Sequence, residues 1–566
     1  MQRGVKISVL AVVAGLAVGL ACAAESTGTI QPEAVGFVGV YRLRDLEPGL
    51  TGEGLRVGVL APSRTYLNNQ PQNDYQPDCS HPCLASAQIA MHDNRKAAPG
   101  LCPHTTAVCS ILVGQDQGGS MPGLGRFSYQ GVIPKAQLDV YELWHFLTRP
   151  LLQRASPGLD LLTISGGSDF EEWWTRALEA MAEDGVVVVA SIGNGSDSLH
   201  PPLYPGAAPN VIAVGMVDPV RSEDLAVATS NFWLVQPEHS SCGPTADGRC
   251  KPDLVAPGTC IVPSSSDDGR YELASSGSSF ATPIVAGIAG ILIQKARQEP
   301  ALAAALSPRT CAPLLKAILL NSAVKLPHWH KGRIGLDDDH QVPLDYAQGA
   351  GLVDAIGAYS QLVSGRFGPG VVPPTGWDVA QIDRANGQVL VYQFDLEAAS
   401  GQVITATLAW NCHYEHAYPF NRLVERTSDL RLELWAIDPA RPQRDVLIDL
   451  SDSPVDNVEH IHAKADGRYS RYQLVVTWSD RGQSVARQEP FAIAWRTAVA
   501  RTDSRIAWED LNGDGVVDQK DYTRLIQNWV TSLRSPGRYT IGDLNADGRI
   551  DQQDLEILGS RTRIGQ

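Results

Sequence analysis

Residues 277–287 read Gly-Ser-Ser-Phe-Ala-Thr-Pro-Ile-Val-Ala-Gly. The stretch places Ser279 on a tight Gly-Ser turn, immediately before an apolar run that predicts a buried helix. A hydroxyl at the N-terminus of a helix lies where free backbone N–H groups and the helix dipole favour developing negative charge. A nucleophile whose attack creates an oxyanion needs that environment. The stretch therefore predicts a nucleophilic serine, and the alternative is a turn that only leads into a buried helix.

Around this stretch, short β-rich runs alternate with helical patterns. The β-rich runs lie at residues 55–61, 138–143, 161–165, 186–191 and 211–217. Such alternation predicts βαβ units on a parallel sheet, with the chemistry at the carboxyl ends of the strands. The predicted fold class of this part of the chain is α/β.

Three motifs here resemble those of the subtilisin-like serine peptidases. Residues 277–287 resemble the serine motif, the run that begins at His104 resembles the histidine motif, and the strand that ends at Asn194 resembles the strand of the oxyanion asparagine. The resemblance implies a three-layer domain with Ser279 as nucleophile, His104 as general base and Asn194 as oxyanion donor.

The resemblance also implies where a substrate would lie. The run Leu-Leu-Thr-Ile-Ser-Gly-Gly at residues 161–167 resembles the family's strand that pairs with substrate backbone, which makes Ser165, Gly166 and Gly167 the expected binding edge. The opposite stretch, residues 141–160, is short, so we expect part of the other wall of the cleft to be missing.

One expected residue is absent. The family's first strand ends in a pattern such as Val-Ala-Val-Ile-Asp-Thr-Gly, whereas residues 57–63 read Val-Gly-Val-Leu-Ala-Pro-Ser and place Ala61 at the carboxylate position. In subtilisin itself, loss of that aspartate alone costs about 3 × 10⁴ in kcat. The sequence thus predicts slow hydrolysis, with Asp74, Asp78 or Asp93 as candidate replacements. The alternative is a pseudopeptidase whose inactive cleft binds peptides or proteins.

The N-terminus predicts export. Arg3 and Lys6 precede an apolar run over residues 7–24, with a possible cleavage site at Ala21-Cys22-Ala23. An uncleaved anchor and a lipidated Cys22 are the alternatives. Export would place the chain outside the cell, in the periplasm or on the cell surface, where its ten cysteines can be oxidised. The formal charge of -16 argues against nucleic acid and anionic membranes as partners.

The end of the chain contains two copies of one loop motif. Oxygen ligands at positions 1, 3, 5, 7, 9 and 12, with glycine at position 6, suit Ca²⁺. The predicted ligands are Asp510, Asn512, Asp514, Val516, Asp518 and Asp521 in the first loop and Asp543, Asn545, Asp547, Arg549, Asp551 and Asp554 in the second. Aspartate at position 12, with an apolar helix after each loop, resembles a dockerin module. That resemblance implies a possible cohesin-type partner.

The sequence therefore predicts five segments. They are a signal peptide (1–23), a lead segment (24–50), a subtilisin-like α/β domain (51–365), an antiparallel β-sandwich (366–500) and a small helical dockerin-like module (505–566). The predicted protein is an exported serine endopeptidase that cuts polypeptides through an acyl-enzyme on Ser279. It needs no cofactor for catalysis, and no membrane-spanning domain is expected beyond the signal.

Overall fold

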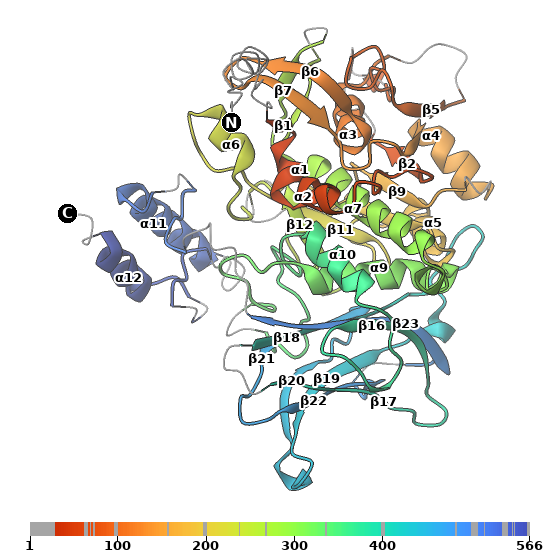
Figure 1. Ribbon diagram of the computed structural model, residues 1–566, viewed down its shortest axis with the longest axis vertical. Helices are drawn as coiled ribbons and strands as arrows, with labels where there is room; N and C mark the ends of the chain where they lie inside the picture. Colours follow the sequence, from red (N-terminus) through yellow and green to blue (C-terminus); the bar gives the residue numbers. More distant parts are fainter. Residues whose placement is uncertain are drawn as a thin grey trace, which may run out of the picture.

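The computed structural model of the 566-residue chain contains a central α/β domain, a β-sandwich below it and a helical module at its side (Figure 1). It describes residues 29–61, 66–67, 70–71, 74–94, 100–154, 158–195, 201–236, 238–265, 269–333, 337–397, 402–481, 484–499, 508–513, 516–534, 541–545, 547 and 549–562. The predicted signal peptide with Cys22 lies outside the described residues, as does Asp514 of the first calcium loop.

A seven-stranded parallel sheet forms the centre of the α/β domain, as the alternation of strands and helices predicts. In order across the sheet its strands are β12 (Leu254–Pro257), β11 (Ile212–Val217), β10 (Val187–Ser191), β9 (Leu161–Ile164), β2 (Arg56–Leu60), β8 (Gln137–Tyr141) and β5 (Gln88–His92). The inner strands β10 and β11 are buried along their whole length because both faces of a parallel sheet are covered.

Helices cover both faces of this sheet. On one face, α3 (Pro103–Val113) and α7 (Ser278–Gln298) share a core with Val57, Val59 and Val140. On the other face, α5 (Trp173–Glu183) packs against Leu60 and Leu162. The three-layer α/β fold is thus confirmed. In the described part of the chain, α7 alone has the length and apolar composition to cross a membrane, but 89% of its apolar window is buried inside the domain.

Smaller elements complete the domain. They are β1 (Ile30–Gln31), α1 (Glu33–Phe37), α2 (Val40–Leu46), β3 (Tyr66–Leu67), β4 (Gln70–Pro71), β6 (Gln115–Met121), β7 (Gly125–Gln130), α4 (Leu143–Phe146), the π-helix η1 (Leu147–Leu152), α6 (Leu225–Ser230), β13 (Ile261–Pro263), β14 (Tyr271–Leu273), α8 (Pro300–Ala303), α9 (Pro308–Ser322) and α10 (Ala355–Val363). The predicted strand at 138–143 is wrong at its end. It stops at Tyr141 because Glu142 caps helix α4.

The predicted β-sandwich is confirmed, with two stacked sheets. One sheet contains β15 (Gly370–Val371), β17 (Leu390–Asp395), β22 (Arg471–Trp478), β19 (Leu430–Ile437) and β20 (Val446–Ser451), and the other contains β16 (Gly376–Asp383), β23 (Gln488–Val499), β18 (Gln402–Trp410) and β21 (Val458–Lys464). All pairs are antiparallel except β15 with β17. Two short 3₁₀ helices, η2 (Val424–Arg426) and η3 (Pro442–Arg444), lie in its loops. Alternating burial along β19 is typical of a sandwich core between two such sheets.

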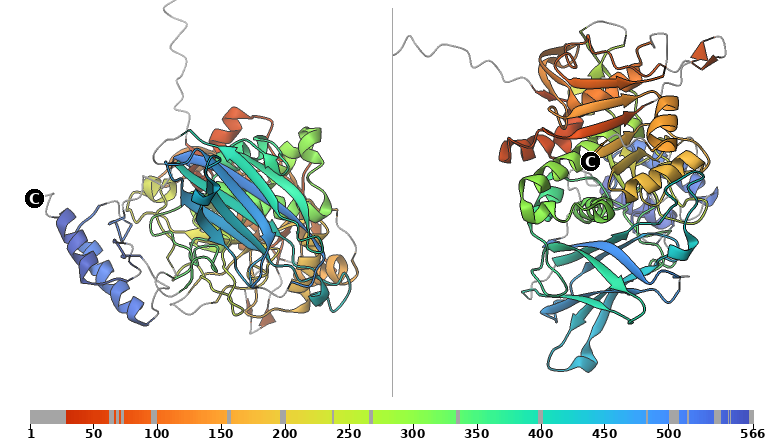
Figure 2. Two further views of the ribbon diagram at one scale, coloured as in Figure 1. Left: turned by 90° about the horizontal axis from the view of Figure 1, so that it is seen from below. Right: turned by 90° about the vertical axis from the view of Figure 1, so that its right-hand side faces the viewer.

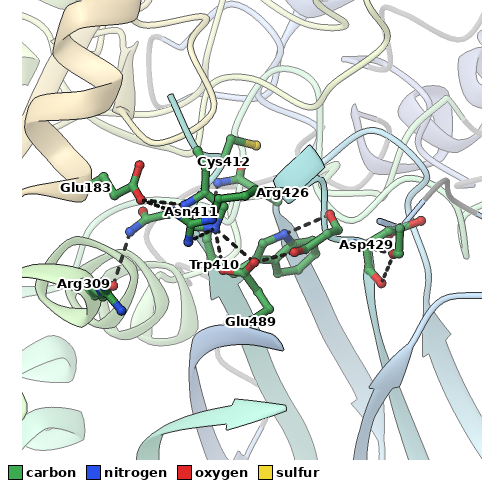
Figure 3. A network of polar contacts seen from close by, with 12 residues as sticks. Glu183, Arg309, Trp410, Asn411, Cys412, Arg426, Asp429 and Glu489 are labelled. Carbon is green, nitrogen blue, oxygen red and sulfur yellow. Dashed lines mark hydrogen bonds and ion pairs between the residues drawn. The ribbon is translucent and has the colours of Figure 1, made fainter. Parts of the chain in front are cut away.

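The sandwich is joined to the α/β domain by α9 and by a polar network. Helix α9 lies between the domain and strands β18 and β23 (Figure 1). In the network, His413 lies between two carboxylates, with Nδ1 2.6 Å from Glu183 and Nε2 3.1 Å from Glu489. Arg426 also contacts Glu183 at 3.3 Å (Figure 3). Because Glu183 belongs to α5 and Glu489 to β23, the network links the two domains.

The C-terminal module has the two predicted helices, α11 (Gln519–Arg534) and α12 (Gln552–Thr562), and it packs against the side of the α/β domain (Figures 1 and 2). The carbonyl of Gly513 accepts a 2.7 Å hydrogen bond from Arg221 N. Gly513 has φ +73°, and a Cβ there would come within 2.4 Å of the Trp233 ring. The ring of Trp508 lies 4.6 Å from that of His328. The first calcium loop is therefore part of the contact between the module and the domain.

Candidate active site

Ser279 lies in the first turn of α7, as its sequence predicts. The residue is half-buried, and its carbonyl accepts a 2.8 Å hydrogen bond from the hydroxyl of Ser165. Ser165 follows β9, so this bond ties the start of α7 to the carboxyl end of the central sheet. The Ser279 side chain thus stands at a helix N-terminus, where backbone N–H groups stabilise negative charge.

Asn194 lies beside the same turn. Its Oδ1 accepts hydrogen bonds from both the backbone N–H and the hydroxyl of Ser278, each at 2.8 Å. Because a backbone N–H can only donate, these bonds identify Oδ1 as the acceptor and make Nδ2 the donor end of the amide. The preceding Gly193 has φ +116°, and a Cβ there would lie 2.6 Å from the Ser241 hydroxyl. The turn after β10 therefore requires glycine next to Asn194.

His104 lies in the first turn of α3. The helix is capped by Cys102, whose Sγ accepts the N–H of Thr105 at 3.4 Å. The hydroxyl of Thr105 donates a 2.8 Å hydrogen bond to the carbonyl of Ala61, directly after β2. The His104 ring centroid lies 6.0 Å from that of Phe280, the residue after Ser279. The fold thus brings the ends of β2, β9 and β10 together with the first turns of α3 and α7.

Ala61 occupies the position at which the subtilisin-like pattern has aspartate. It is 2% exposed and belongs to the core shared with α3 and α7. Each of the three aspartates named as possible replacements accepts a hydrogen bond from another residue. Asp74 accepts the N–H of Gly100 at 2.9 Å, Asp78 accepts the hydroxyl of Ser80, and Asp93 accepts the hydroxyl of Tyr75 at 2.6 Å.

The expected substrate edge continues beyond the end of β9. Ser165 N donates to Leu60 O at 3.0 Å, and Ser168 and Tyr204 exchange two backbone hydrogen bonds of 2.8 and 2.9 Å. Gly166 and Gly167 lie between these points and are half-buried. On the other side of β2, the described residues between 142 and 160 contain α4 and η1 and no strand. This agrees with the expectation that part of the other wall of the substrate cleft is missing.

The two predicted calcium loops have the same internal hydrogen bonds. Asp521 accepts backbone N–H groups of Leu511, Asn512 and Asp518, and Asp554 accepts those of Leu544, Asn545 and Asp551. Asp521 and Asp554 are both fully buried. Buried carboxylates in a loop rich in oxygen ligands are costly without a cation, so these residues fit calcium. Among the described residues, Asp338, Asp339 and His340 are the one group of His, Cys, Asp or Glu side chains that brings three ligand atoms within 4.8 Å of one another.

The sequence did not single out Ser278, which holds Asn194 in place. Its position next to Ser279 was the available signal, but its role depends on a contact across 84 residues. The predicted oxidation of cysteines has no counterpart in the described part of the chain, where no disulfide links any of its nine cysteines.

Comparison with known proteins identifies a family for two parts of the chain. The model of the subtilase family matches residues 85–351, and that of the dockerin type I domain matches residues 508–561. The first match spans His104, Asn194 and Ser279 but begins after Ala61.

Two relatives have similar sequences. Serine protease AprX of Bacillus subtilis (strain 168) is 33% identical over 159 residues, which are 24% of this chain and 34% of AprX. Proprotein convertase subtilisin/kexin type 9 of Rattus norvegicus is 35% identical over 155 residues, which are 27% of this chain and 19% of that protein. The chain thus spans about a third and about a fifth of the length of these relatives.

Among solved structures, the prenylagaramide maturation protease PagA has a TM-score of 0.38 and 21% identity, covering 58% of this chain and 99% of its own. The self-cleaved protease domain of PatA has a TM-score of 0.37 and 24% identity, with 56% and 99% covered. Residues 85–351 of the chain belong to the subtilase family, and residues 508–561 form a dockerin type I domain.

Proposed function

We propose that this protein is an exported serine endopeptidase with slow turnover. Ser279 is the nucleophile, His104 the general base and Asn194 the oxyanion donor. The observation that supports this most is the pair of hydrogen bonds from Ser278 to Asn194 Oδ1, because they orient the amide at the turn that carries Ser279. A fold that only needed a buried helix here would not require a polar amide held in this way.

The proposed reaction follows from the positions of these groups. His104 accepts the proton of the Ser279 hydroxyl as the oxygen attacks the peptide carbonyl. Asn194 Nδ2 and the backbone N–H of Ser279 donate to the oxyanion, supported by the N-terminus of α7. His104 then returns the proton to the leaving amine, and water releases the acyl group. The backbone of the substrate pairs with residues 165–167.

The remaining assignments are also proposals. The segment boundaries at 23, 50, 365 and 500 follow the sequence pattern, and the signal would direct the protein out of the cell. The two loops would bind Ca²⁺ through the ligands named above, and the dockerin type I domain would attach the enzyme to a cohesin-type protein. Calcium would have a structural role, since the loops lie apart from Ser279 and His104.

The first test is labelling by a fluorophosphonate probe, which reacts only with an activated serine. We expect slow labelling of the purified chain that is lost in Ser279→Ala. The matched control is Ser276→Ala, which removes an exposed hydroxyl three residues away whose partner is Thr259. Labelling that persists in Ser279→Ala, or none in the wild type, would overturn the peptidase assignment.

The second candidate function is a pseudopeptidase that binds peptides in its cleft and is displayed through the dockerin domain. Alanine at position 61 is the observation that favours it. This function predicts no labelling of the wild type together with saturable binding of peptides that Gly167→Pro abolishes, because proline removes the backbone donor from the edge. A Cβ at position 167 would also come within 2.6 Å of Tyr204 O, so thermal unfolding checks that this variant folds.

A further inference from the structure

We infer that Glu142 orients His104 in place of the missing aspartate. The inference rests on the proposed peptidase function and concerns the same site. Glu142 would be a positioning residue, since it acts through His104 and does not touch the substrate. Its sequence context, the end of a strand followed by Leu-Trp-His-Phe, matches no subtilisin-like motif.

The register of the sheet places Glu142 beside Ala61. In the parallel pair of β2 and β8, Gly58 is the partner of Asp139 and Val59 is the partner of Val140. Two residues further along, Ala61 is level with Glu142. Neighbouring strands lie about 4.8 Å apart. The chain thus has a carboxylate on the strand next to position 61, where the subtilisin-like pattern has aspartate.

The alternation of side chains puts both residues on the face of the sheet that carries α3. Val59, Ala61 and Val140 belong to the core shared with α3 and α7, whereas Leu60 and Tyr141 belong to the core on the opposite face. Side chains two residues apart in a strand point to the same face, so Glu142 lies on the side of Val140 and Ala61. Helix α3, whose first turn contains His104, covers this face, and the hydroxyl of Thr105 donates to the carbonyl of Ala61.

The Glu142 carboxylate is held in place. The residue is 2% exposed, and Oε2 accepts the N–H of His145 at 2.8 Å, which caps α4. Burial and Asp93 raise the pKa of Tyr75, and the charge of Glu142 adds to this effect.

Asp93 is the other candidate carboxylate for orienting His104 from this face of the sheet. His92 of β5 is the partner of Tyr141, so Asp93 is level with Glu142 but lies one strand further from Ala61. Its carboxylate also accepts the hydroxyl of Tyr75 at 2.6 Å. Glu142 is therefore the carboxylate nearer to the vacant aspartate position, and its side chain is longer by one methylene.

In the proposed role, Glu142 acts through its charge, since no hydrogen bond to His104 Nδ1 or to Glu142 Oε1 is present in the described part of the structure. The charge favours the tautomer of His104 with the proton on Nδ1, which leaves Nε2 to accept the proton of Ser279. It also stabilises the imidazolium that forms during attack. Because it acts from the neighbouring strand, the effect is weaker than that of an aspartate at position 61. This accounts for slow turnover without a complete loss.

The test compares peptide hydrolysis by four purified chains: wild type, Glu142→Gln, Ala61→Asp and the double variant. Glutamine keeps the volume and one acceptor oxygen for the His145 N–H, while it removes the charge and replaces the other oxygen by an N–H donor. We expect Glu142→Gln to lower kcat by about 100-fold with little change in KM, as for a misoriented base. We expect Ala61→Asp to raise kcat, and the same Glu142→Gln change to have almost no effect in that background.

The outcomes separate this inference from the proposed function. If Glu142→Gln lowers kcat equally in the wild-type and Ala61→Asp backgrounds, Glu142 only supports the fold. If it lowers kcat in neither background, Glu142 has no role in catalysis. Either result overturns the inference and leaves the proposed peptidase function intact. A wild type that shows neither hydrolysis nor probe labelling overturns both the inference and the proposed peptidase function. Asp93→Asn is the matched control, and a 100-fold loss there instead would assign the role to Asp93. Thermal unfolding of each variant checks that it folds.

Discussion

Ser278 and Asn194 show how one contact can orient a reactive group. The two hydrogen bonds from Ser278 occupy Asn194 Oδ1 and leave Nδ2 as the donor end of the amide. In the proposed mechanism the amide is therefore oriented before substrate arrives, which is the basis of electrostatic stabilisation of an oxyanion.

Replacing this amide tests the oxyanion role at the residue scale. Asn194→Leu keeps the size of the side chain and removes the donor, and we expect kcat to fall by about 10² to 10³ with KM little changed. Steady-state kinetics on a peptide substrate measure this. Asn231→Leu, at an exposed asparagine whose side chain donates to Val227 O and Ser230 Oγ, is the control. A change in KM alone would show that Asn194 binds substrate and does not stabilise the oxyanion.

At the scale of the element, each predicted calcium loop forms a unit with the helix that follows it. Each loop is closed by the aspartate at position 12, through three backbone N–H groups, and each is followed by a helix, α11 or α12. The loops are acidic, so their carboxylates repel one another without a cation. We therefore expect metal binding and helix formation to be coupled.

Removing one ligand tests this coupling. We expect titration calorimetry to detect two calcium sites in the wild type, and Asp521→Asn and Asp554→Asn to lose one site each. Excess chelator should lower the helical circular dichroism of the full chain by the content of α11 and α12. A stoichiometry that stays at two in both variants would mean that these aspartates are not ligands. Asp224→Asn, which caps the short exposed helix α6, serves as the control.

At the scale of the whole molecule, a buried histidine joins the α/β domain to the sandwich. Burial lowers the pKa of His413, but Glu183 and Glu489 outweigh it and raise the pKa to about 9. The charged groups that face the ring are these two carboxylates and Arg426. The pKa of Glu183 is lowered by His413 and Arg426 against the effect of burial.

This pKa shift predicts how stability depends on pH. A pKa that is raised in the folded state stabilises the protein fully below about 6.5, and the stabilisation is lost as the pH rises through about 9. The loss amounts to about 3 kcal/mol at most. We expect thermal unfolding to show a fall in stability between these pH values that His413→Gln removes. His416→Gln, an exposed change nearby, should keep the fall, and a fall that persists in His413→Gln would contradict the prediction.

Much of the architecture could be predicted from local patterns. The runs that became β9, β10 and β11 are continuous apolar segments, and such segments are typical of a parallel sheet covered on both faces. Strand β21 lacks such an apolar pattern. It contains Glu459 and His460, both fully buried, and polar residues of this kind favour a loop in any reading of the sequence alone. Their burial depends on partners such as Ser451 and Thr407, which other strands supply.

The sequence by itself determined the order of the domains, the helix that begins at Ser279, the candidate residues His104 and Asn194, and the two acidic loops. These features depend on residue type, spacing and turn chemistry within a few positions of one another. Only the tertiary structure decided that Glu142 is level with Ala61, that Ser278 holds Asn194 and that Gly513 contacts Trp233. Those relations depend on strand register and on packing between segments far apart in the chain, and no local pattern encodes either.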